Sequence, residues 1–288
     1  MKPRLDLPRF LPALLVALLT LLGACAAPRP SPPAGLEPAE RDALVLGLLD
    51  GEALYTVCGG LKPVSSGFWQ ASFAVDAPDL SGIERVRATL AALELGPDLV
   101  AGVQVFAEVH EGRRHVQAFV AHRPALRALL ASEAAFFGPL GLGPGADPFE
   151  VLCTVERMPR LGRFRGYGLL FGYPRHAVDF FVAAAEEEER TGKLPPREFA
   201  HIATFGAEKH RFVWAVPPGH VDGPEDLALR ASAAPILARY RAQRERFTRD
   251  EDVDALGLLH AVVNDVRPTL PPRPARAVPA SLEPAFAP

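Results

Sequence analysis

Residues 103–120 read VQVFAEVHEGRRHVQAFV, and their alternation decides the class of fold. Small or branched apolar residues occupy every second position before the central Glu-Gly-Arg-Arg and again after it. A period of two directs alternate side chains to opposite faces of a β-strand, so the stretch predicts two antiparallel strands joined at residues 111–114. The apolar set comprises Val103, Val105, Ala107, Val109, Val116, Ala118 and Val120.

This hairpin also contains the best metal-ligand candidates of the sequence. If residues 111–114 form the turn, His110 lies opposite His115 and Glu108 lies opposite Gln117, all on the face away from the valines. Cross-strand neighbours are about 5 Å apart, so one divalent ion can contact two imidazoles and a carboxylate there. A solvated polar face accounts for the same residues equally well, so we assign no metal and expect no cofactor.

A second hairpin is predicted in the last third of the chain. Its strands are Phe199–Phe205 and His210–Val216, and residues 206–209 form its turn. His201 and His210 lie in register with aromatic side chains, which favours half-buried core histidines over metal ligands. Both hairpins are followed by a helical pattern, which raises the hypothesis of an internal duplication.

Amphipathic periodicity predicts helices around the hairpins. Ser81 and Glu84 have the spacing of a capping box, with Ser81 as the N-cap. An acidic run at 186–189 opposes the dipole at the end of a later helix, which we expect to fray. We therefore predict an α+β fold in which an antiparallel sheet of hairpins has helices packed on one face. The expected helices span residues 37–49, 82–95, 123–130, 149–158, 174–189 and 224–249, and the expected loops span 59–67 and 159–166.

The N-terminal region has the features of an export signal. A basic segment precedes Phe10–Leu22, which is too short for a helix of the about 20 residues that span a membrane. Leu22-Gly23-Ala24-Cys25 then resembles the lipobox of bacterial lipoprotein precursors. The resemblance implies cleavage before Cys25 and lipid attachment to that residue, and Ala26 in place of Asp favours the outer membrane where there are two membranes. An ordinary cleavable signal with an incidental cysteine is the alternative.

Prolines mark the ends of the globular part. They concentrate in residues 28–38 and 268–288, where they favour extended chain over packed structure. The predicted organisation is a lipoprotein signal peptide at 1–24, a Pro-rich tether at 25–38, a single α+β domain at 39–266 and a Pro-rich disordered tail at 267–288.

The two cysteines of the predicted domain suggest a disulfide. Export would place Cys58 and Cys153 in an oxidising compartment, where two thiols in one domain commonly pair. Alternatively, Cys58 and Cys153 remain unpaired as small buried residues. A third possibility is that Cys58 is a nucleophile, although no recognisable histidine partner accompanies it in the sequence.

Potential catalytic groups are scattered along the chain. His176 and Asp179 share one helical face, a spacing that can orient an imidazole for acid–base chemistry. Ser65 and Ser66 follow Lys62 without the order of a known serine-hydrolase motif. An enzyme would have to bring such groups into one pocket, either Ser65 with His176 and Asp179, or His201 with Cys58.

Charge and composition limit the classes of partner. The chain has 288 residues and a formal net charge of −3, which argues against nucleic acid as a partner. Arginines on the helix at 224–249 could face an anionic membrane, but the acidic residues after it favour internal pairing. We expect a lipid-anchored periplasmic protein that binds an envelope partner or serves envelope assembly, with no reaction identified. An exported hydrolase and a periplasmic metal-binding protein are the alternatives.

Overall fold

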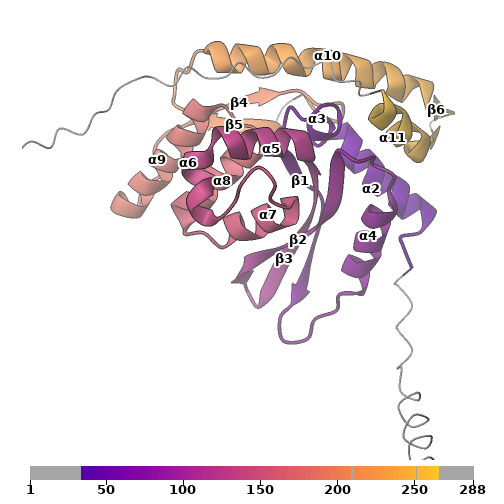
Figure 1. The fold of residues 1–288 in the computed structure, drawn as a ribbon, viewed down its shortest axis with the longest axis horizontal. Coiled ribbons are helices and arrows are strands. Elements are labelled where there is room, and N and C mark those ends of the chain that lie inside the picture. The colour runs from indigo at the N-terminus through magenta and orange to yellow at the C-terminus, as the bar shows by residue number, and fades with distance from the viewer. Residues whose placement is uncertain (1–33, 209–210, 251, 266–288) are drawn as a thin grey trace, which may run out of the picture. The chain divides into compact units, whose positions relative to one another are not determined.

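A three-stranded antiparallel sheet forms the centre of the fold (Figure 1). Its strands are β1 (Val64–Ala74), β2 (Leu99–His110) and β3 (Arg113–His122), in the order β1-β3-β2. The computed structural model describes residues 34–208, 211–250 and 252–265. The predicted signal peptide, Cys25, most of the tether and the tail lie outside the described residues, so the lipid anchor stays a prediction.

The hairpin predicted from residues 103–120 is confirmed, with a shorter turn. Glu111 and Gly112 form a two-residue connection with φ angles of 49° and 71°. Positive φ at both central residues matches the right-handed twist of the flanking strands, which explains this turn in place of the expected four-residue one. His110 therefore pairs with Arg113, and the register shifts between Val105 and Val109.

Strand β1 includes residues that we expected to form a loop. The loop predicted at 59–67 ends at Pro63, and Val64 begins a strand that pairs with β3. Its register is irregular between Ser66 and Gln70. Gly67 lies in this irregularity with a φ of 84°, a conformation that L-residues rarely adopt.

Helices cover both faces of the central sheet. In β3, Val116 and Ala118 pack with the helices before the hairpin, whereas Phe119 and Ala121 pack with those after it. The predicted α+β class with an antiparallel sheet is confirmed, but the helices are not limited to one face, because both side-chain sets of β3 are apolar. The helices are α2 (Pro38–Asp50), α3 (Leu54–Val57), α4 (Ser81–Ala92), α5 (Arg123–Ser132), α6 (Ala134–Phe137), the 3-10 turn η1 (Gly138–Leu140), α7 (Pro148–Glu156), α8 (Arg160–Leu170), α9 (Arg175–Thr191), α10 (Pro224–Arg246) and α11 (Ala255–Asn264).

The second hairpin is also confirmed, as a separate two-stranded sheet. Strands β4 (Glu198–Ile202) and β5 (Phe212–Val216) pair antiparallel, with Ala200 opposite Trp214. His210 lies outside the described residues. In the described residues the first hairpin has a third strand and the second has none, so what the two share there is a hairpin followed by a helix. A short pair, β6 (Thr248–Arg249) and β7 (Asp252–Val253), follows α10.

Two predictions, the N-cap of α4 and the loop at 159–166, need correction. Ser81 is the first residue of α4 and Leu80 is its N-cap, because Asp79 accepts a hydrogen bond from the Ser81 backbone N–H. The loop expected at 159–166 is largely helix α8.

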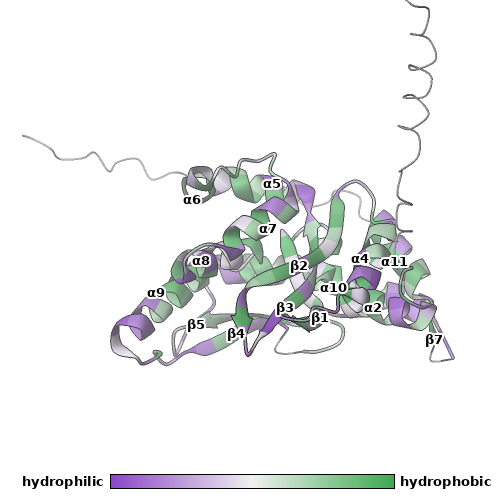
Figure 2. Ribbon diagram, turned by 90° about the horizontal axis from the view of Figure 1, so that it is seen from below, coloured by the Kyte–Doolittle hydropathy of each residue, from purple (hydrophilic) through white to green (hydrophobic). Residues whose placement is uncertain are grey.

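Helix α9 continues through its acidic run instead of fraying. Arg160 pairs with Glu188 and Glu189, which neutralises part of the charge at the hydrophilic end of α9 (Figure 2). Gly192 then ends the helix in a left-handed conformation. In the described part of the chain, no helix has both the length and the apolar character needed to cross a membrane.

Candidate metal centre

The beginnings of helices α9 and α10 meet and bring three potential metal ligands together. His176 is the second residue of α9, and Asp226 is the third residue of α10. His220 lies in the segment that connects β5 to α10. The two helix ends are tied by the Arg175 backbone N–H, which donates to Glu225 Oε2 at 2.9 Å.

Local sequence fixes the position of Asp226. Gly223 is the N-cap of α10 and Pro224 occupies the first helical turn, where its missing N–H costs nothing. The Gly223 backbone N–H donates to Asp226 Oδ2 at 3.0 Å, as in a capping box. The carboxylate is consequently held beside the helix terminus and is fully buried.

Both imidazoles approach the same carboxylate oxygen. His176 Nε2 lies 2.9 Å from Asp226 Oδ2, and His220 Nε2 lies 3.3 Å from it. The two rings are stacked, with centroids 4.9 Å apart. One ligand atom from each residue lies within 4.8 Å of the other two. Metal–nitrogen and metal–oxygen bonds of about 2.0–2.2 Å require ligand atoms roughly 3–3.5 Å apart around a tetrahedral ion, so small side-chain adjustments suffice.

Two atoms of this cluster lack hydrogen-bond partners. Within the described residues, Asp226 Oδ1 and His220 Nε2 are buried and unsatisfied, because the His220 contact does not have hydrogen-bond geometry. A buried polar atom without a partner costs about 1–3 kcal/mol. A cation bound by all three side chains would satisfy both atoms. The His176 side chain is 35% exposed, so the cluster is accessible from solvent.

An ion pair lies next to this cluster. Asp222 Oδ2 accepts a hydrogen bond from Arg230 Nε at 2.6 Å. This bond lowers the pKa of the Asp222 carboxyl, and the charges of His220 and His176 lower it further. Arg230 also donates to the His201 carbonyl oxygen and lies 5.9 Å from the ring centroid of Trp214.

The structure places the metal-ligand candidates of the first hairpin, His110, His115 and Glu108, against other partners. His110 pairs with Arg113, and His115 lies opposite Ser72 on β1. Gln117 pairs with Gln104, and Glu108 contacts Arg163 at 3.6 Å. The short turn and the irregular register of β2 explain why His110 and His115 do not oppose each other. In residues 34–208, 211–250 and 252–265, the trio His176, His220 and Asp226 is the group with metal-ligand spacing.

His176 was a sequence candidate, but with a different partner. Asp179 pairs with Arg165 at 2.6 Å, and the carboxylate that orients His176 comes from α10. Sequence reasoning missed His220 and Asp226. The Gly-Pro-Glu-Asp start of α10 could have identified Asp226 as a fixed, helix-capping carboxylate, but nothing local indicated its histidine partners.

The serine candidates belong to the core. Ser65 is fully buried, and its hydroxyl lies 2.8 Å from that of Thr56. Lys62 is also buried, pairs with Glu52 at 2.5 Å and lies 4.3 Å from the ring centroid of Phe212. Within the described residues, neither Lys62 nor Ser65 has a hydrogen bond or ion pair with His176, whose partner is Asp226.

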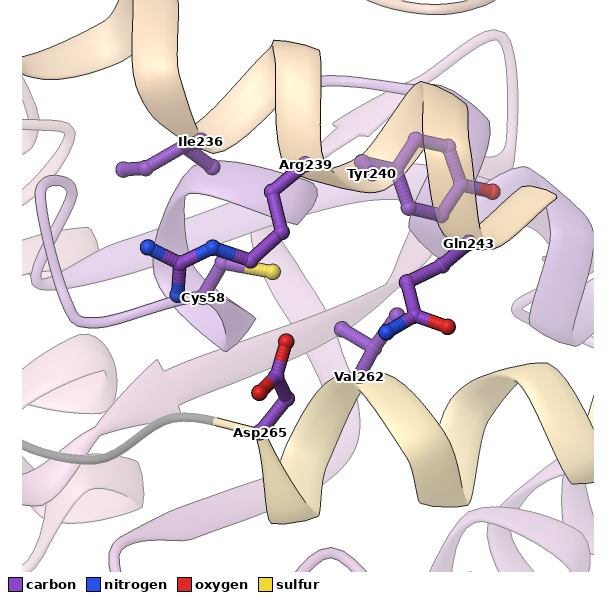
Figure 3. A pocket seen from close by; sticks show the side chains of 7 residues that line it. All are labelled: Cys58, Ile236, Arg239, Tyr240, Gln243, Val262 and Asp265. Atoms are coloured by element: carbon purple, nitrogen blue, oxygen red, sulfur yellow. The ribbon is translucent and has the colours of Figure 1, made fainter.

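The predicted disulfide does not form in this structure, where Cys58 and Cys153 are free thiols. Cys58 ends α3 and packs against the cluster of α2, α10 and α11, whereas Cys153 lies on α7. Burial raises the pKa of the Cys58 thiol to about 12, which disfavours the nucleophilic thiolate. Cys58 lines a cavity of about 20 Å³, and His201 is not among the lining residues, which Figure 3 labels.

Comparison of the chain with protein-family models, curated proteins and solved structures found no match.

Proposed function

We propose that this protein is a lipid-anchored cell-envelope protein whose periplasmic domain binds a divalent transition-metal ion. The observation that carries the proposal is the convergence of His176 Nε2, His220 Nε2 and a carboxylate oxygen of Asp226 within 4.8 Å of one another. The lipobox at Cys25 and the Pro-rich tether support the location, with the outer membrane favoured where the cell has two membranes. The envelope partner expected from the sequence stays a prediction.

The chemistry of the ligands favours zinc and related ions. Imidazole nitrogens suit Zn²⁺, Ni²⁺, Cu²⁺ and Fe²⁺, whereas Ca²⁺ and Mg²⁺ prefer shells of oxygen ligands. Two imidazoles and one carboxylate provide three of the four ligands of a tetrahedral zinc ion. Because His176 is partly exposed, water or another ligand can reach the remaining position.

The site also fits binding better than serine or cysteine catalysis. Two of the nucleophile candidates, Ser65 and Cys58, lie in other parts of the core, and in the described part of the chain no histidine is among the hydrogen-bond partners of Ser65 or the residues lining the cavity beside Cys58. The exported-hydrolase alternative therefore has no support from the arrangement of these groups.

Isothermal titration of the purified mature chain with Zn²⁺ tests the metal proposal. We expect one zinc ion per chain. His176→Ala and His220→Ala should each lower the zinc affinity by at least tenfold, because each removes one of three ligands. His115→Ala is the matched control, since it removes an exposed imidazole outside the trio. Equal affinity in all four proteins would exclude the site.

The lipid anchor has its own test. Mass spectrometry of the N-terminal peptide should find Cys25 as the first residue, carrying lipid. Cys25→Ser should release the protein from the membrane fraction. An unmodified Cys25 in a protein that retains Met1 would contradict the anchor without affecting the metal centre.

A further inference from the structure

We propose that His122 is a pH-sensitive latch, which holds the first turn of helix α5 while its imidazole is neutral and releases it when the ring takes up a proton. His122 is the last residue of β3 and the N-cap of α5. Its Nδ1 accepts a hydrogen bond from the Ala125 backbone N–H at 3.1 Å. The inference goes beyond the proposed function, because neither residue belongs to the metal centre.

The hydrogen bond requires the unprotonated form of the ring. A neutral imidazole has one N–H and one nitrogen that accepts, so the proton of His122 is on Nε2 when Nδ1 accepts from Ala125. A second proton, on Nδ1, would place two donors against each other. The cation would also lie at the N-terminus of α5, where the helix dipole is positive. The common N-cap residues keep their acceptor oxygens near neutral pH, whereas a histidine cap loses its acceptor there.

The ring lies between α5 and the loop that follows α3. Gly60 on this loop has a φ of 69°, and a Cβ there would overlap with His122 Nδ1 and lie 2.7 Å from the Ala125 Cβ. The His122 backbone N–H also donates to the Pro63 carbonyl oxygen at 2.9 Å. Loss of the cap therefore loosens the contact between the loop and α5 together with the first turn of the helix.

The surroundings of the ring disfavour its charged form. Burial lowers the pKa of the His122 imidazole, and the charge of Asp98, just before β2, opposes this shift. The arginines of α5, Arg123 and Arg127, are exposed to solvent. Burial thus outweighs the one carboxylate that favours the imidazolium.

The loop after α3 carries two further titratable groups. The Lys62 ammonium is bound to a carboxylate, and burial raises the pKa of the Cys58 thiol, which is neutral as a result. The sign of the pH effect follows from the lowered pKa of His122, because the unfolded chain takes up the proton first. The stabilisation by the latch is complete above the ordinary histidine pKa of about 6.5 and is lost as the pH falls toward the lowered value.

Hydrogen exchange of the Ala125 amide, followed by NMR in the mature chain with a chelator present, tests the latch. Its protection is compared at about pH 7.5 and about pH 5, on either side of the ordinary histidine pKa, after correction for the intrinsic exchange rate. In the wild type, we expect protection to fall about fivefold or more at the lower pH, as for the loss of one N-cap. In His122→Asn, whose side chain accepts at both pH values, protection should not change. His115→Asn is the matched control, since it removes an exposed histidine of the same strand and should retain the wild-type fall.

Three results would overturn the latch. They are equal protection of Ala125 at the two pH values in the wild type, an equal fall in the wild type and His122→Asn, and loss of the fall in His115→Asn. Melting curves at about pH 7.5 show whether His122→Asn is folded, and His122→Asp, a cap that stays ionised at both pH values, replaces it if it is not. The wild-type comparison tests the latch without either variant.

Discussion

His176 and Asp226 are 50 residues apart in the chain, yet His176 Nε2 lies 2.9 Å from Asp226 Oδ2. This contact joins the first turn of α9 to the first turn of α10. Asp226 is fully buried, so its charge depends on the groups around it: the Gly223 N–H, His176 and His220. The carboxylate therefore has a structural role before any metal binds.

That role predicts a difference between two substitutions at position 226. Asp226→Asn keeps one oxygen that can accept from the Gly223 N–H, so it should lower the free energy of unfolding of the metal-free protein by only about 1 kcal/mol. Asp226→Ala leaves the Gly223 N–H and the His176 imidazole without this acceptor, at a cost of about 2–4 kcal/mol for the two groups together. Urea denaturation with a chelator present measures both. An Ala variant as stable as wild type would contradict the structural role.

The buried pair of Lys62 and Glu52 predicts an asymmetry. Lys62 is fully buried, whereas the Glu52 side chain is 26% exposed. Glu52→Gln leaves a buried ammonium without its counter-charge, which costs about 3–5 kcal/mol. Lys62→Met should cost less, because the remaining carboxylate can be hydrated and methionine retains contact with the aromatic rings around it. Urea denaturation at pH 7 measures the free energy of unfolding of Glu52→Gln and Lys62→Met. If Lys62→Met were the less stable variant, the predicted asymmetry would be contradicted.

The same pair predicts a pH effect of defined sign. Burial lowers the pKa of Lys62 in the folded protein, and Glu52 opposes this shift. Between the folded and unfolded pKa values the unfolded chain binds the extra proton, so this lysine makes the folded state more stable as pH rises. Glu52→Gln removes the carboxylate that opposes the shift, so the increase in stability with pH should begin at a lower pH. The urea midpoints of wild type and Glu52→Gln, measured across a pH series, test this prediction. The difference between the two midpoints should narrow as pH rises, and a difference that does not narrow would contradict it.

Two glycines with the same backbone angle predict different costs of substitution. Gly112 and Gly172 both have a φ of 71°. A Cβ at Gly112 meets nothing within 4 Å, whereas one at Gly172 lies 3.0 Å from the Leu61 carbonyl oxygen. Gly112→Ala should cost about 1–2 kcal/mol from the left-handed conformation alone. Gly172→Ala should cost more, since backbone atoms must also move, and equal melting temperatures for the two variants would contradict this.

Local patterns predicted much of the fold. Alternation defined the hairpin of β2 and β3, and amphipathic periodicity located α2 and α10. These elements depend on neighbours in sequence. By contrast, β1 begins with Val-Ser-Ser-Gly, which has weak strand character, and it forms because β3 offers pairing partners from far along the chain.

Helix α8 shows another limit of local reasoning. Its arginines and glycines are typical of a loop, but Gly166 and Gly168 allow close helix packing. A Cβ at Gly166 would lie 2.7 Å from Val155 Cγ1, and one at Gly168 would lie 2.9 Å from Val178 Cγ2. The helix depends on α7 and α9 for its stability, so its own sequence does not indicate it.

The candidate site was the least predictable part. His176 was recognised from its helical spacing, but with Asp179 as partner. His220 lies in a connecting segment without periodicity, and Asp226 reads as an ordinary helix-capping residue. Only the packing of α9 against β5 and α10 brings the three together, and this packing depends on core residues that carry no signal of metal binding.

The most direct test of the metal centre is a crystal of the mature protein grown with Zn²⁺, with data collected at the zinc absorption edge. An anomalous peak should lie within bonding distance, about 2.0–2.2 Å, of His176 Nε2, His220 Nε2 and an Asp226 oxygen. A map with no peak there, while the three side chains keep their direct contacts at a saturating zinc concentration, would contradict the metal centre.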